Sequence, residues 1–182
     1  YTKDYPVEQL YRDQRLNPIH EGTEGIHGLD LLGRKVLLNN GESFQMFLTM
    51  VARTVADAEN IPEIAYLAPP VREAIERATR VTESLMPRVM EDPDSGLANA
   101  TIYLDMFGQF VMAWIWLQQA VVAARKLSAS ELGHTEHEHD FYQGKISAAQ
   151  YFIARELPQT VQKAALLEIN ESTCFDMRAA YF

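Results

Sequence analysis

The chain has 182 residues, of which 47% are apolar and 23% charged, and its formal net charge is −9. This is the balance of a globular protein, and the negative charge argues against nucleic acid or an anionic membrane as a partner, because binding phosphate groups requires cations. A single cysteine, Cys174, gives no internal disulfide framework and fits a reducing compartment, so we expect a cytoplasmic protein.

Two helices are expected on either side of a glycine-containing turn near the start of the sequence. The first spans Pro6–Arg15, and Pro18 then ends it, because a residue before proline is pushed out of the α region. Thr23 is a good N-cap for the second, whose apolar face consists of Ile26, Leu29, Leu31, Leu32 and Val36. Glu21 is therefore expected just ahead of a helix N-terminus, next to Gly22, where the backbone can approach a ligand closely.

Three longer helices are predicted over residues 42–60, 71–90 and 97–128. The longest has an apolar seam formed by Tyr103, Met106, Phe110, Ala113, Leu117, Ala120, Ala124 and Leu127. Further apolar residues cover most of its remaining surface, which is typical of the central helix of a bundle or of a membrane helix. Its longest unbroken apolar run, Phe110–Leu117, is far shorter than the roughly twenty residues of a membrane span, so we predict a central bundle helix and no membrane span.

Residues 132–140 hold His134, His137 and His139 among acidic residues. Imidazole groups at this density could bind zinc or nickel. The alternative is a charged loop that connects two helices. Because no cysteine and no second ligand cluster stands at a usual spacing, we favour the loop and predict no metal site.

A last long helix is predicted from about Ser147, with a kink or break at Pro158. Its inward-facing residues are expected to be Tyr151, Leu157, Val161, Ala165 and Ile169. No alternation typical of a β-strand reaches a useful length. The sequence therefore predicts an all-α fold, an antiparallel helical bundle of about five to seven helices.

The ordered run from Tyr11 to Lys35 resembles the signature near the end of the catalytic core of flavin-dependent acyl-CoA dehydrogenases. Residues 11–15 read Tyr-Arg-Asp-Gln-Arg, where the family reads Tyr-Arg-Asp-Ala-Arg. Residues 20–26 read His-Glu-Gly-Thr-Glu-Gly-Ile, where the family has Tyr-Glu-Gly-Thr followed by Gly-Ile or Ile-Gln. An ordered match of this length is specific, whereas Glu-Gly-Thr alone would mean little.

The resemblance implies that Glu21 is the base that removes the α-proton of an acyl-CoA thioester. It places Gly22 and His20 at substrate contacts, and His20 stands where the family often has tyrosine, which would alter the acyl pocket. The positions that it places near the flavin nucleotide are Thr23, Glu24 and Gly25. A carboxyl group buried beside an acyl chain has a raised pKa and is a stronger base, and in the family a backbone N–H at this glutamate helps to stabilise the enolate-like oxygen.

A second resemblance covers the later part of the chain. Phe141–Lys145, Ala148–Phe152 and then Leu157 with Pro158 are similar to the C-terminal extension on one branch of the same family. The two resemblances imply that residues 1–39 end the catalytic helical domain and that residues 40–182 form a helical-bundle extension. They also imply a C-terminal fragment of a larger enzyme, inactive and without FAD by itself.

For the full-length enzyme the family implies FAD as cofactor, an acyl-CoA substrate, electron-transfer flavoprotein as electron acceptor, and a homodimer. Two other hypotheses remain open. One is a helical interaction or oligomerisation module that docks through the face around Trp114 and Trp116, and the other is a metal-binding bundle. Neither accounts for the ordered motif around Glu21.

Overall fold

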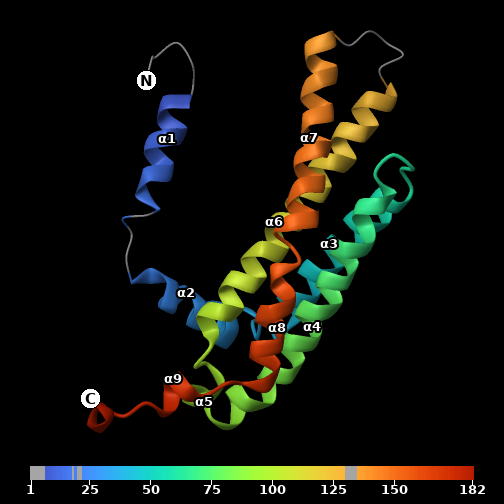
Figure 1. The fold of residues 1–182 in the computed structure, drawn as a ribbon. Coiled ribbons are helices and arrows are strands. Elements are labelled where there is room, and N and C mark those ends of the chain that lie inside the picture. The colour runs from blue at the N-terminus through green and yellow to red at the C-terminus, as the bar shows by residue number, and fades with distance from the viewer. Residues whose placement is uncertain (1–6, 18, 20–21, 130–134) are drawn as a thin grey trace.

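The computed structural model describes residues 7–17, 19, 22–129 and 135–182, and within these ranges it contains helices and turns but no strand. The first part of the chain forms α1 (Val7–Leu16), α2 (Thr23–Asp30), a π-helical turn (Leu31–Lys35), α3 (Glu42–Glu59), a short 3₁₀ turn (Ala65–Leu67) and α4 (Ala68–Glu91). The second part forms α5 (Pro93–Gly96), α6 (Ala100–Ser128), α7 (Glu136–Arg155), α8 (Gln159–Ile169), α9 (Thr173–Asp176) and a final 3₁₀ turn (Ala179–Tyr181). The predicted all-α bundle is confirmed (Figure 1).

The long helix α6 is the centre of the bundle. It packs against α2, α3, α4, α7 and α8. Seven of the eight residues of its predicted seam are buried, and Leu127 is half-buried. Phe47 of α3 meets Phe110 and Trp114 of α6 edge-on, with ring centroids 5.7 and 5.4 Å apart, a favourable arrangement for aromatic rings. Within the described residues α6 is the one helix that satisfies the length and hydropathy criteria of a membrane span, and its contacts with five neighbours agree with a core helix.

A second buried cluster joins the start of the chain to the bundle. Leu32 and Val36, from the π-helical turn and the residue after it, pack with Val81 and Leu85 of α4 and with Tyr103 of α6. The π-helical geometry is visible in the hydrogen bond from the Val36 N–H to the Leu31 carbonyl oxygen, 3.0 Å long. This cluster anchors α2 to the bundle.

The last part of the fold differs from the prediction in two respects. The helix begins at Glu136 rather than near Ser147, because Thr135 and Glu138 form a reciprocal capping box. The break at Pro158 is confirmed, since α7 ends at Arg155 and α8 begins at Gln159. Of the five residues predicted to face inward only Leu157 is buried, and the exposed ones are Tyr151, Val161, Ala165 and Ile169.

Helix α1 differs from the other long helices because it contains no buried residue. Its apolar side chains Val7, Leu10, Tyr11 and Leu16 are all more than 40% exposed. Figure 1 shows α1 as a separate arm beside the bundle. The chain therefore presents an amphipathic helix whose apolar side chains are exposed among the described residues.

Candidate functional site

The predicted site residues lie on both sides of the start of α2. His20 and Glu21 lie outside the described residues. Gly22 is the N-cap of α2, with φ 79°, and Thr23, Glu24 and Gly25 form the first turn. The prediction of Thr23 as N-cap is therefore wrong by one residue, because Gly22 can adopt the left-handed conformation that begins this helix.

The first turn of α2 has open space around its glycines. Among the described residues, a Cβ atom built on Gly22 or Gly25 would meet no atom from another part of the chain within 4 Å. Gly22 offers no side chain to cap the helix. The N–H groups of a first helical turn are donors without a partner inside the helix, and they favour an anion such as a phosphate. This backbone is thus compatible with a nucleotide phosphate close to Gly22.

The position of α2 depends on its contact with α6. A Cβ atom on Gly28 would lie 2.7 Å from the Ala100 carbonyl oxygen and 3.0 Å from the Thr101 nitrogen, which only glycine avoids. After Gly28, Arg34 donates a hydrogen bond to Asp30 and lowers the pKa of that carboxyl group. The contact at Gly28 packs the last turn of α2 against the first turn of α6.

A cavity of about 550 Å³ lies between Glu24 of α2 and the first two turns of α6, where it is lined by Thr101, Ile102, Leu104 and Asp105. Asp105 also forms an ion pair with Lys163 of α8 at 2.5 Å. Carboxylate and threonine oxygens accept hydrogen bonds from hydroxyl groups, so this cavity suits a polar ligand. Sequence reasoning missed Thr101 and Asp105, because only the packing of α2 against α6 brings them to Glu24.

The other candidate residues from the sequence lie elsewhere. His137 and His139 are exposed on the first turn of α7, and His134 lies outside the described residues. No group of three His, Cys, Asp or Glu residues that could hold a metal occurs within the described ranges. The absence of a metal from the complete histidine cluster stays a prediction.

The two tryptophans are both half-buried and pack against the core. The Trp114 indole N–H donates to the Thr54 hydroxyl oxygen at 2.9 Å. The Lys145 ammonium lies 5.6 Å from the centroid of the Trp116 ring. A docking face formed by exposed tryptophan rings therefore has no support from the fold.

Comparison with known proteins identifies relatives of this chain. The model of a family described as "Acetyl-CoA dehydrogenase C-terminal like" matches residues 47–178. A broad-specificity linear acyl-CoA dehydrogenase of Mycobacterium tuberculosis is 26% identical over 190 residues, covering 100% of this chain and 30% of that protein. A 3-methylmercaptopropionyl-CoA dehydrogenase of Ruegeria pomeroyi is 29% identical over 84% of this chain and 25% of that protein. A butyryl-CoA dehydrogenase of Syntrophomonas wolfei is 23% identical over 97% of this chain and 28% of that protein.

These relatives are larger than the sequence that they match. The chain spans 25–30% of their length. The family match covers most of the chain, including α4, α6, α7 and α8. This all-α chain therefore belongs to the acetyl-CoA dehydrogenase C-terminal like family and is homologous to the C-terminal part of acyl-CoA dehydrogenases.

Proposed function

We propose that this chain is the C-terminal portion of an FAD-dependent acyl-CoA dehydrogenase. Residues 1–39 would end the catalytic helical domain, and residues 40–182 would form the helical extension. The observation that carries the proposal is the similarity to an acyl-CoA dehydrogenase over 100% of the chain, which includes the motif from Tyr11 to Lys35 as well as the bundle. A bundle without catalysis would not require that motif.

The proposed reaction converts an acyl-CoA thioester to the trans-2-enoyl-CoA. The Glu21 carboxylate takes the proton from the α-carbon, and Gly22 and His20 contact the substrate. Backbone N–H groups at this turn stabilise the negative charge that develops on the thioester oxygen. FAD, when bound, accepts the hydride that leaves the β-carbon. Each substrate molecule thus loses one proton to Glu21 and one hydride to the cofactor.

The residues proposed to hold the flavin nucleotide are Thr23, Glu24 and Gly25. Support comes from the open space at Gly25, from the helix N-terminus behind Gly22 and from the cavity that Glu24 shares with α6. A phosphate group would accept hydrogen bonds from first-turn N–H groups, and the Glu24 carboxylate would accept them from hydroxyl groups. The residues present thus fit a nucleotide.

The remaining partners belong to the same proposal. Electron-transfer flavoprotein would reoxidise the reduced flavin. The intact enzyme would be a homodimer in the cytoplasm, since a helical extension can cover surface that would otherwise join two dimers into a tetramer. Light scattering on the intact protein tests the assembly, and a stable tetramer would contradict it.

The base is tested in the intact protein with the substitution Glu21→Gln. This amide has nearly the same shape as the carboxylate but cannot accept the α-proton. We expect FAD to stay bound and its bleaching by an acyl-CoA to slow by a factor of ~10² to 10⁴. The control is Glu42→Gln, which removes a carboxylate from the exposed start of α3. Bleaching of the Glu21→Gln variant at the unaltered rate would refute the role of Glu21.

A specific observation also supports a second candidate, a helical oligomerisation module without catalysis. Apolar side chains of α1 and α2 are exposed, among them Leu10, Ile26 and Leu29. In the first proposal the remainder of the catalytic domain covers them, and in the second another protein does. A visible flavin spectrum of the intact protein, bleached by an acyl-CoA, would favour the first. An intact protein that binds no flavin would favour the second.

A further inference from the structure

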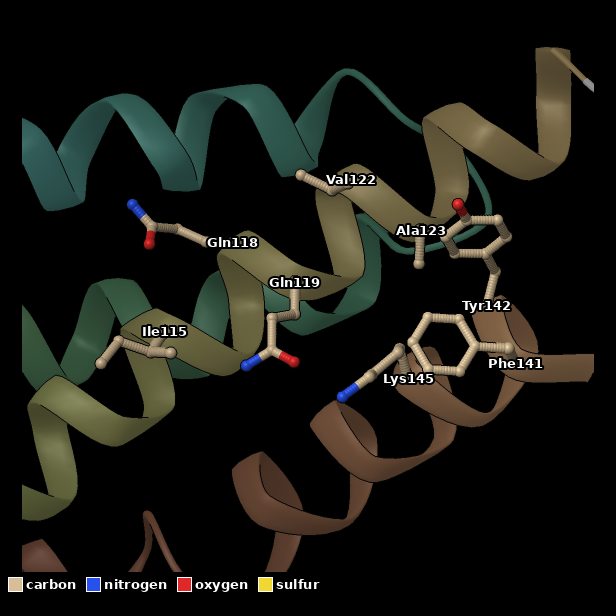
Figure 2. Close-up of a pocket in the computed structure, with 8 residues that line it drawn as sticks. All are labelled: Ile115, Gln118, Gln119, Val122, Ala123, Phe141, Tyr142 and Lys145. Carbon is tan, nitrogen blue, oxygen red and sulfur yellow. The ribbon is translucent and has the colours of Figure 1, made fainter. Parts of the chain in front are cut away.

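A groove with apolar walls lies between the later half of α6 and the first half of α7, away from the motif at α2. Its volume is about 300 Å³, within the lower range of small-ligand pockets. Ile115, Val122 and Ala123 of α6 form one side, and Phe141 of α7 forms part of the other. Figure 2 shows these side chains around the groove, together with Gln119 and Lys145.

Lys145 is the cationic group of this groove. Its ammonium nitrogen lies 5.6 Å from the ring centroid of Trp116 and 5.4 Å from that of Phe141. Such contacts hold an ammonium group by electrostatic attraction to the ring faces without neutralising its charge. Within the described residues no ion pair joins Lys145 to a carboxylate.

Among the residues that the structure describes, no carboxylate of α6 or α7 is paired with Lys145. The one acidic residue of α6 is Asp105, near the other end of that helix and paired with Lys163. The acidic residues of α7 lie in its first turns, where Glu138 serves the capping box. Lys145 therefore places a localised positive charge beside an apolar groove, in a chain whose net charge is −9.

We infer that this groove binds a small ligand with an apolar tail and a single anionic head group, of the chemical class of a medium-chain carboxylate. The tail would cover the exposed surface of Val122 and Phe141, which are each 55% exposed. The head group would pair with the Lys145 ammonium and accept a hydrogen bond from the Gln119 amide. A purely apolar ligand would leave the role of the cation unexplained.

The inference does not rest on the proposed dehydrogenase activity, because the groove shares no residue with the cavity at Glu24. The test is titration of the intact protein with decanoate, below the concentration at which it forms micelles, and with the uncharged 1-decanol. Calorimetry measures the affinity. We expect saturable 1:1 binding of decanoate, about tenfold tighter than that of decanol, because an ionic hydrogen bond contributes that much.

Substitutions distinguish the contribution of the Lys145 charge to decanoate binding from that of the groove's shape. Lys145→Gln should weaken decanoate binding about tenfold and leave decanol binding unchanged, and Lys145→Arg should restore decanoate binding. Arg155→Gln is the matched control, because it removes one positive charge from the exposed end of the same helix outside the groove. Val122→Asp, at an exposed position of the rim, should abolish decanoate binding through repulsion.

Four binding results would overturn the inference. They are the absence of saturable decanoate binding, equal affinities for decanoate and decanol, equal effects of Lys145→Gln and Arg155→Gln, and no effect of Val122→Asp. Chemical acetylation gives an independent readout. Lys145 of the intact protein should react with a water-soluble acetylating reagent, and decanoate should protect it. If Lys145 were protected from acetylation without added decanoate, another part of the intact protein would already cover the groove, and the inference would fail.

Discussion

Gly28 of α2 and Ala100 of α6 approach so closely that a Cβ atom on residue 28 would lie 2.7 Å from the Ala100 carbonyl oxygen. A carbonyl oxygen at the start of a helix cannot move aside as a flexible side chain can. The absence of a side chain at position 28 therefore determines how near α2 can lie to the bundle.

Gly28→Ala should destabilise the protein, because either α2 or the first turn of α6 must shift. We expect a loss of ~1–3 kcal/mol in the free energy of unfolding, the usual cost of overpacking. Urea unfolding measures it. The control is Gly108→Ala on the exposed surface of α6, where a Cβ atom would meet nothing within 4 Å. That variant should be more stable by ~0.5–1 kcal/mol, because alanine favours a helix. Equal effects at both positions would contradict the close contact.

Tyr103 is buried, and its hydroxyl lies 2.7 Å from the Thr82 hydroxyl. Burial raises the pKa of Tyr103 to about 12, above its ordinary value of 10.0. The folded state therefore retains the proton that the unfolded state loses first. The corresponding stability is fully present below pH 10 and declines as the pH rises toward 12, by about 2 kcal/mol.

Tyr103→Phe removes this dependence. The variant should be less stable by about 1 kcal/mol at pH 7, the worth of one hydrogen bond. The stability difference from the unaltered protein should shrink and then reverse between pH 10 and 12. Urea midpoints across this range measure the difference. Tyr66→Phe, at a half-exposed tyrosine, should show no such reversal. Parallel curves for the unaltered protein and Tyr103→Phe would refute the raised pKa.

Thr160 joins α8 to α4. Its buried hydroxyl donates to the Leu157 carbonyl oxygen at 2.7 Å and accepts a hydrogen bond from the Arg77 guanidinium at 3.0 Å. Thr160→Val should cost ~1–3 kcal/mol, because it leaves a partly buried guanidinium without this acceptor. Thr49→Val is the control, since the exposed Thr49 hydroxyl donates to the Gln45 carbonyl oxygen within its own helix. A loss at Thr160 no larger than at Thr49 would contradict the link to α4. The midpoints of thermal unfolding of the two variants measure both losses of stability.

The 182-residue chain by itself should be colourless and inactive. It spans 25–30% of its dehydrogenase relatives, so most of a flavin site would have to come from elsewhere. The visible absorption spectrum of the purified chain and an acyl-CoA oxidation assay with an artificial electron acceptor test this. A yellow chain that oxidises an acyl-CoA would be inconsistent with the proposed division of the enzyme.

The sequence predicted the centre of the fold well and its last helices poorly. The heptad spacing of Tyr103 through Ala124 is strong enough to identify the buried seam of α6. The predicted inward face of α7 and α8 assumes one helical period across Pro158, although the helix is interrupted between Arg155 and Gln159. The packing instead buries another face of each helix, formed by Ile146, Ala149 and Ile153 of α7 and by Thr160, Ala164 and Leu167 of α8.

The candidate site was predictable only where it is continuous in sequence. The motif gave residues 20–25, and the structure describes Gly22 to Gly25 at the start of α2. Thr101 and Asp105 could not be found by pattern, because about eighty residues separate them from Glu24 and only the packing of α2 against α6 brings them together. Thr135 and Glu138 form the Thr-x-x-Glu pattern that indicates a capping box, but the dense charges around them favour a loop.

The attachment of α2 to α6 has a consequence for how this protein tolerates change. The position of the first turn of α2 depends on α6, a helix that packs against five others. A substitution that shifts α6 relative to its neighbours would therefore also displace Gly22. Under the proposed function, such a variant would lose turnover although every group that touches the thioester is intact.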